Sequence, residues 1–156
     1  GARSVLSIDS SAEALEMARE NVGLNGLSTE ACQWSVADAF TELRRLRDRA
    51  ARFDAIVLDP PRFAATAAQA DRAARGYKDI NLLAFKLLRP GGRLFTFSCS
   101  GGISPELFEK IVAGAALDAQ VQAAILQWLG QPSDHPVVLS FPEGRYLKGL
   151  VCQRLA

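Results

Sequence analysis

The sequence predicts an α/β fold, with a mostly parallel sheet, helices on both faces and an antiparallel pair of strands at the C-terminal end. Short apolar runs alternate with amphipathic helical patterns along most of the chain, which is typical of βα units. The last two apolar runs, 121–129 and 146–154, have no helical pattern between them. Without a crossover helix they should pair antiparallel.

Length, charge and cysteine content limit the class of protein. The 156 residues suit one domain, and 18 basic against 17 acidic residues give no general attraction for nucleic acid. No apolar run is long enough to span a membrane. Cys32, Cys99 and Cys152 are odd in number and lack metal-ligand spacing, which predicts a reduced, cytoplasmic protein without disulfides or a metal site. Because the chain begins at Gly1, we expect it to be a piece of a longer protein.

The first half of the chain contains two predicted βα units. A strand ends at Asp9, and Ser10 with Glu13 forms a capping-box pattern at the start of a helix that should end at Asn25-Gly26. A second strand, 32–37, leads to Asp38. The helix that follows carries a basic face, for which solvation is favoured over a phosphate contact. Its members are Arg44, Arg45, Arg47, Arg49 and Arg52.

The apolar run 53–58 is the central strand of the prediction, and its composition favours burial on both faces. The next residues are Asp59-Pro60-Pro61, and two prolines cannot donate ladder hydrogen bonds, so the strand must end there. One acid therefore lies in a rigid corner at the carboxyl edge of the sheet, where α/β proteins bind ligands. A solvated aspartate at a strand end is the alternative.

The second half continues the alternation. Residues 62–75 are Ala-rich and suggest a flexible or helical lid, and 80–88 form a clear helical stripe. A strand at 93–97 leads into Ser-Cys-Ser-Gly-Gly, and Ser104 with Pro105 begins another helix.

Four polar residues follow predicted strands: Asp9, Asp38, Asp59 and Cys99. Right-handed crossovers should bring them to one edge, around one crevice. Acids after early strands can bind ribose hydroxyls and an adenine amino group. Taken singly, Asp9 and Asp38 could be helix caps, and Cys99 could be buried filler. Cys99, however, lies between two serines and shortly before a helix N-terminus, a position that favours a thiolate.

Four segments resemble successive motifs of class I S-adenosylmethionine methyltransferases, which have a Rossmann-like sheet. They are Val-Leu-Ser-Ile-Asp-Ser-Ser, Val-Ala-Asp-Ala-Phe, Val-Leu-Asp-Pro-Pro-Arg-Phe and Phe-Ser-Cys-Ser. The tail 134–148, with its Asp-His-Pro and Phe-Pro-Glu motifs, makes the chain similar to the bacterial large-subunit (23S) ribosomal RNA cytosine-5 methyltransferases that carry a PUA domain.

This resemblance implies roles for individual residues. Cys99 would be the nucleophile, and Asp59 would lie beside the methyl group and the target base. Asp9 would bind the ribose of S-adenosylmethionine, and Asp38 its adenine amino group. The implied cofactor contacts in full are Asp9, Ser10, Asp38, Ala39, Asp59 and Pro60. The implied contacts to the ribosomal RNA are Pro61, Arg62 and His135.

The chain also departs from the family pattern. No Gly-x-Gly-x-x-Gly loop precedes Asp9, and the first strand and the PUA domain are absent. That strand is central in the usual order, so the sheet must close the gap, borrow a strand or leave one unpaired. We therefore expect this chain alone to be inactive and to bind S-adenosylmethionine weakly or not at all. A homodimer is a further expectation.

Other functions are open on the sequence alone. In an N-methyltransferase, Asp59-Pro60-Pro61 would orient an exocyclic amine and Cys99 would only pack. A non-catalytic remnant would bind RNA or a partner through the basic face between Arg44 and Arg52. A dehydrogenase would explain a ribose-binding acid but not the Asp-Pro-Pro and Ser-Cys-Ser motifs. Arg62 and Lys148, as exposed cations, could meet phosphate or act on Cys99.

Overall fold

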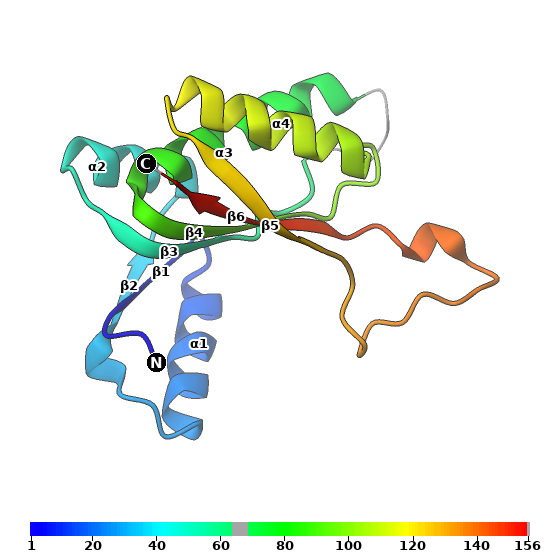
Figure 1. The fold of residues 1–156 in the computed structure, drawn as a ribbon. Coiled ribbons are helices and arrows are strands. Elements are labelled where there is room, and N and C mark those ends of the chain that lie inside the picture. Colours follow the sequence, from blue (N-terminus) through cyan, green and yellow to red (C-terminus); the bar gives the residue numbers. More distant parts are fainter. Residues whose placement is uncertain (64–68, 156) are drawn as a thin grey trace. The chain divides into compact units, whose positions relative to one another are not determined.

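The computed structural model describes residues 1–63 and 69–155, and its contacts divide the chain into two compact units, 1–49 and 50–156 (Figure 1). The first unit contains β1 (Val5–Asp9), α1 (Ala12–Leu24), β2 (Cys32–Val36) and α2 (Ala39–Asp48). β1 and β2 are parallel, with Asp9 aligned with Val36. Both predicted βα units of this half are therefore present.

The start of α1 differs by one residue from the prediction. Ser11, not Ser10, is the N-cap, because its Oγ accepts a hydrogen bond from the Ala14 backbone N–H at 3.1 Å. The Asp9 carboxylate accepts from the Ser11 N–H at 2.7 Å and so stabilises the turn before the helix. The helix ends as predicted at Asn25, followed by Gly26 at a φ of 67°.

The second unit contains a four-stranded mixed sheet. Its elements are β3 (Phe53–Leu58), α3 (Ala70–Leu87), β4 (Leu88–Ser98), α4 (Pro105–Asp118), β5 (Ala123–Leu129) and β6 (Lys148–Arg154). The strand order is β3-β4-β6-β5, with β3 parallel to β4 and β6 antiparallel to both of its neighbours. The predicted antiparallel pairing of the last two strands is confirmed. Within the described residues β1 and β3 each pair on one side only.

Helices α3 and α4 pack against each other on one face of this sheet (Figure 1). The predicted helical stripe is confirmed, since Ile80, Leu83 and Leu87 are buried in α3. The helix begins at Ala70, so the C-terminal part of the predicted lid is its first turn, whereas 64–68 lie outside the described residues. β4 starts directly at Leu88, earlier than the predicted strand at 93.

The expectation that the strand 53–58 is buried on both faces is wrong. Leu58 is buried, but Val57 is 67% exposed. Successive side chains of a strand point to opposite faces, and within the second unit α3 and α4 cover only one of them. Among the described residues no helix has the length and apolarity needed to cross a membrane.

The packing around Gly149 provides a test of the β4-β6-β5 order. Gly149 is aligned with Phe97 on one side and Leu129 on the other, and a Cβ there would lie 2.5 Å from the Phe97 ring and 3.2 Å from the Leu129 Cβ. We expect Gly149→Ala to lower the free energy of unfolding by about 1–3 kcal/mol through overpacking. Urea unfolding of this variant and of Gly130→Ala, where no atom lies within 4 Å, checks it. Equal stabilities would contradict the alignment.

Candidate active site at the carboxyl edges of the strands

Asp59 and Cys99 emerge at the same edge of the four-stranded sheet. β3 and β4 are parallel, with Leu58 aligned with Thr96, so the residues that follow the two strands leave at their common carboxyl end. Asp59 is exposed and Cys99 is half-buried. The geometry predicted for this pair is present in the second unit.

Asp9 and Asp38 form a corresponding pair in the first unit. Asp9 ends β1, and the Ala37 N–H donates to the Asp9 carbonyl at 2.9 Å, which brings the segment before Asp38 alongside it. Because the two pairs belong to different units, a single crevice bordered by all four side chains stays a prediction.

Asp38 caps helix α2, as the structural alternative predicted. Its Oδ1 accepts hydrogen bonds from the Thr41 N–H and from the Thr41 hydroxyl, each at 2.9 Å. These bonds, with the charge of Arg44, hold the pKa of Asp38 below its ordinary value of 3.8. Ala39 is the first residue of the helix and Ser10 is exposed in the turn after β1. Capping does not exclude a cofactor contact, since the carboxylate stays ionised.

The Asp-Pro-Pro corner is tied to the loop that carries Cys99. Pro60 is half-buried, whereas Pro61 and Arg62 are exposed. The Phe63 backbone N–H, just beyond them, donates to the Ser100 hydroxyl at 3.0 Å. The strand ends of β3 and β4 are therefore joined by a hydrogen bond as well as by the sheet.

Ser100 is the centre of a buried polar cluster. Its hydroxyl lies 2.9 Å from that of Tyr77, and its N–H donates to the Ser98 hydroxyl at 3.3 Å. All three side chains have no exposed area, and the Tyr77 ring packs against the rings of Phe63 and Phe108. This cluster is not predicted from the sequence. Two serines beside the cysteine, and a tyrosine in the apolar stripe of a helix, were the signals available.

Lys148 differs most from the prediction. The sequence predicts an exposed cation at this position, yet Lys148 is only 8% exposed at the start of β6. Its Nζ donates to the carbonyls of Ser100 at 2.6 Å and Ile103 at 2.7 Å. Burial lowers the pKa of Lys148, and the nearby negative charge of Cys99 opposes that shift. The long stem lets a polar head on a central strand reach loop carbonyls.

The three cysteines have different environments. Cys152 is buried, and the loss of solvation, together with the charge of Glu109, raises its pKa to about 11, so its thiol is a poor nucleophile. Cys32 lies at the start of β2, at the amino end of the strand, where its thiol contacts the Ser28 carbonyl at 3.7 Å. Only Cys99 of the three follows the carboxyl end of a strand.

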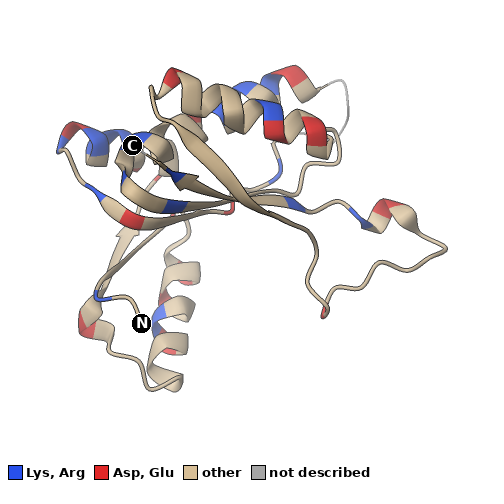
Figure 2. Cartoon of the chain, in the orientation of Figure 1, with Lys and Arg blue, Asp and Glu red and all other residues tan. Residues whose placement is uncertain are grey.

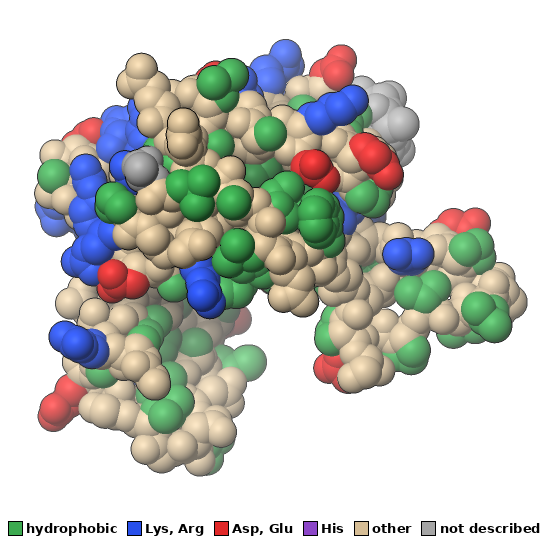
Figure 3. All heavy atoms as spheres, in the orientation of Figure 1, with side chains coloured by type: hydrophobic (Ala, Val, Ile, Leu, Met, Phe, Trp, Pro, Cys, Tyr) green, Lys and Arg blue, Asp and Glu red, His purple; other side chains and the backbone are tan. Residues whose placement is uncertain are grey.

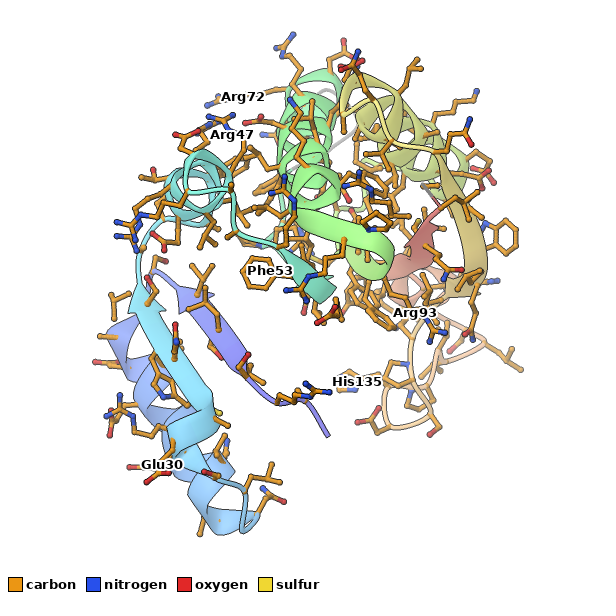
Figure 4. All side chains as sticks on the ribbon, turned by 60° about the vertical axis from the view of Figure 1, so that its left-hand side comes forward. Glu30, Arg47, Phe53, Arg72, Arg93 and His135 are labelled. Carbon is orange, nitrogen blue, oxygen red and sulfur yellow. The ribbon has the colours of Figure 1, made fainter. Side chains whose placement is uncertain are left out.

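A long loop, 130–147, leaves β5 and returns to β6 beside this edge, since Lys148 is aligned with Ser98. His135 lies on this loop with its ring pointing away from it, and its Nδ1 is 3.5 Å from a carboxylate oxygen of Asp134 (Figure 4). Hydrophobic side chains also gather on the surface of the loop (Figure 3). The large exposed ones other than proline are Val138, Leu139, Phe141 and Tyr146. No cluster of possible metal ligands occurs among the described residues.

Comparison with known proteins supports the fold. No family model matches the chain. The crystal structure of SMU.776, a protein described as a methyltransferase and complexed with SAH, superposes with a TM-score of 0.82 at 20% identity, over 98% of this chain and 40% of that one. This chain has the Rossmann-like fold of S-adenosylmethionine-dependent methyltransferases. The methyltransferase fold places its ligand edge at the carboxyl ends of the strands, which is where Asp59 and Cys99 lie.

Relatives found by sequence indicate which kind of methyltransferase this chain resembles. The chain is 56% identical over 151 residues to the ribosomal RNA large subunit methyltransferase I of Aeromonas hydrophila, and 54% identical over 153 residues to that of Shewanella amazonensis. These alignments cover 97% and 98% of the chain. The chain spans only 38% and 39% of the lengths of these two relatives.

Ser100 can be tested through stability. We expect Ser100→Ala to lower the free energy of unfolding by about 1–3 kcal/mol, because the Phe63 N–H and the Tyr77 hydroxyl both lose a buried partner. Ser140→Ala, at an exposed loop position, is the control. Chemical unfolding measures both. A loss no larger than that of the control would mean that the cluster does not stabilise the fold.

Asp38 can be tested through pH. A pKa lowered in the folded state means that the cap stabilises the protein above pH 3.8 and that this contribution is lost as the pH falls through the folded-state pKa. Asp38→Ala should therefore be less stable than wild type at neutral pH, with the difference shrinking in acid. Thermal unfolding of both proteins from neutral to acidic pH measures this difference. Thr41→Val, which keeps the backbone donor, should lose less. A difference independent of pH would contradict the cap.

Proposed function

We propose that this protein is an S-adenosylmethionine-dependent methyltransferase that forms 5-methylcytosine in large-subunit ribosomal RNA. The observation that carries the proposal is the position of Cys99. It is a half-buried thiol at the carboxyl edge of a methyltransferase sheet, held between two buried serines and next to the Asp59 corner. The similarity to ribosomal RNA large subunit methyltransferase I supplies the RNA class.

The chemistry explains why a thiol is needed at this edge. Cytosine C5 is a weak nucleophile, so the Cys99 thiolate adds to C6 and shifts electron density onto C5. C5 then takes the methyl group of the sulfonium. A base removes the C5 proton, the Sγ–C6 bond breaks, and its electrons return to sulfur. Asp59, exposed at the same edge, is proposed as that base or as a contact to the ring.

The carboxylates of the first unit suit S-adenosylmethionine, which supplies the methyl sulfonium. Asp9 uses Oδ1 to accept from Ser11, and its Oδ2 has no hydrogen-bond partner among the described residues, so it can accept from a ribose hydroxyl. Asp38 is proposed to accept from the adenine amino group. Ser10 and Ala39 adjoin these acids. Pro60, with Asp59, would line the methyl side of the site.

The RNA contacts are proposed for the exposed parts of the same edge. Methylation at a ring carbon requires an unpaired or flipped base. Pro61 and Arg62 follow Asp59 and are exposed. His135 lies on the loop 130–147, on which Phe141 is 60% exposed and Tyr146 is 40% exposed. Aromatic side chains on such a loop suit stacking on unpaired bases.

An N-methyltransferase is the second candidate, because the same fold and the same Asp-Pro-Pro corner can orient an exocyclic amine. In that reaction Cys99 would have no chemical role. The observation that favours the cytosine-5 reaction is that Cys99 is the only one of the three cysteines at the carboxyl edge and keeps partial exposure.

Binding of RNA by the arginine face alone is less well supported. Helix α2 ends at Asp48, so Arg52 does not belong to it, although basic side chains do gather on the helix (Figure 2). Arg45 is paired with buried Glu42 at 2.7 Å, and Arg47 with Asp48 at 2.8 Å. Because these arginines already pair with neighbouring carboxylates, the helix face is better explained as a solvated surface than as an RNA-binding one.

Two further properties belong to the proposal. The free cysteines suggest a cytoplasmic location. A homodimer is also proposed, and light scattering would measure it.

Replacement of Cys99 tests the cytosine-5 reaction. Because this chain alone is expected to be inactive, the test uses the full-length protein to which it belongs. Labelled methyl transfer to unmodified ribosomal RNA should be lost by at least about a thousandfold in Cys99→Ala, because the covalent step has no substitute nucleophile. Cys32→Ala, at the opposite end of its strand, should stay near wild type. Mass spectrometry of the nucleosides identifies the base. Transfer that persists in Cys99→Ala, or label on an exocyclic amine, would favour the N-methyltransferase.

Replacement of Asp9 tests the cofactor site. In the full-length protein, Asp9→Ala should weaken S-adenosylmethionine binding about 10- to 100-fold, since a charged hydrogen bond to a ribose hydroxyl is lost. Isothermal titration calorimetry measures the change, with exposed Glu20→Ala in α1 as the control. Equal affinities for the two variants would remove Asp9 from the site.

A further inference from the structure

The buried ammonium of Lys148 is not explained by the fold alone. Its side chain leaves a central strand of the second sheet, and its two hydrogen-bond partners are carbonyl oxygens, which are neutral. In the described part of the chain no carboxylate forms an ion pair with it. A buried charge without a counter-charge is costly, so such a group is usually retained for a specific purpose.

Both carbonyls that Lys148 binds belong to the loop immediately after Cys99. Ser100 and Ile103 flank Gly101-Gly102, and the Ile103 N–H closes the turn by donating to the Ser100 carbonyl at 3.1 Å. The ammonium thus bonds both ends of a turn whose two glycines give it little rigidity of their own. This fixes the backbone on the C-terminal side of the thiol.

Cys99 is also the ionisable group whose charge acts on Lys148. Burial lowers the pKa of Lys148, and a negative charge on Cys99 opposes that shift. Glu109 of helix α4, which packs on β6, acts on Cys152 instead. Because the Lys148 Nζ donates to the carbonyl of Ser100, the residue after Cys99, a thiolate at Cys99 would supply the counter-charge that this ammonium lacks.

We propose that Lys148 is a positioning residue for Cys99: it fixes the loop 100–103 behind the thiol and supplies the positive charge that stabilises sulfur as the thiolate. The inference rests on the proposed function, in which Cys99 is the nucleophile. When the Sγ–C6 bond forms, negative charge moves from sulfur into the cytosine ring. When that bond breaks, the electron pair returns to sulfur. Lys148 transfers no proton and stabilises the sulfur anion before the first step and after the last.

Because the Lys148 side chain is buried, it is not available to bind an RNA phosphate. The competing explanation is that Lys148 only stabilises the loop, which requires its two hydrogen bonds but not its charge. Substitutions separate the two. Lys148→Arg keeps the charge, Lys148→Gln keeps hydrogen-bond donors without the charge, and Lys148→Met keeps only the stem. Lys78→Gln, which removes a half-buried lysine paired with Asp118 at 2.8 Å, is the matched control.

The test is alkylation of Cys99 by iodoacetamide in the intact protein, followed by mass spectrometry of the Cys99 peptide. At about pH 7 the rate should fall about tenfold in Lys148→Gln and Lys148→Met, because fewer thiols are ionised without the neighbouring charge. Lys148→Arg should stay within about threefold of wild type, and Lys78→Gln should match it. At about pH 10 all the variants should react alike, since every exposed thiol is then ionised.

Several results would overturn the inference. If Lys148→Gln is folded and its Cys99 is alkylated at the wild-type rate at neutral pH, the charge of Lys148 does not stabilise the thiolate. A rate ratio that is the same at neutral and alkaline pH means that access to the thiol, not its ionisation, has changed. Circular dichroism establishes folding. If the neutral variants do not fold, the wild type decides: Cys99 must react faster at neutral pH than Cys32, which is also half-buried and lacks a cation partner among its described contacts.

Alkylation needs neither RNA nor methyl transfer, so the two proposals can fail separately. Transfer that survives Cys99→Ala would end the cytosine-5 mechanism, while alkylation would still report on Lys148. Loss of transfer in Cys99→Ala combined with wild-type alkylation in Lys148→Gln would leave the mechanism intact and reject the role of Lys148.

Discussion

The buried hydroxyl of Ser100 is the interaction on which the candidate site depends. It receives the Phe63 N–H from the loop after β3 and pairs with the Tyr77 hydroxyl from α3, so one oxygen joins two loops and a helix. Water cannot replace either bond at a fully buried position. The positions of Asp59 and Cys99 relative to each other follow from this oxygen and from the parallel pairing of β3 and β4.

Side chains of the same type have different chemical properties in this protein, because their solvation differs. Burial beside a carboxylate makes Cys152 hard to ionise, whereas Cys99 keeps partial exposure and has a cation nearby. In the same way Lys78 is an ordinary surface ion pair, and Lys148 is an ammonium in the protein interior. Residue type alone is a poor guide to reactivity, because the environment decides which charge is stable.

The two units share one construction. Each has parallel strands with an acid at a carboxyl end, and in each a side-chain or backbone hydrogen bond links the two neighbouring strand ends. Asp9 and Asp38 hold the turns that start α1 and α2, so the same carboxylates that could receive a cofactor also fix the backbone around it. A site built from such residues is preorganised, and its loss on mutation combines stability and binding.

The sequence by itself determined the strands, the helices and the strand ends that carry Asp59 and Cys99, because apolar periodicity, caps and prolines act over a few residues. It also indicated the antiparallel closing pair. Only the tertiary structure decided that β6 lies between β4 and β5, that Val57 faces an uncovered side, and that Lys148 is buried against the Ser100 and Ile103 carbonyls. Each of these depends on contacts between segments about 20 residues or more apart, which no local pattern encodes.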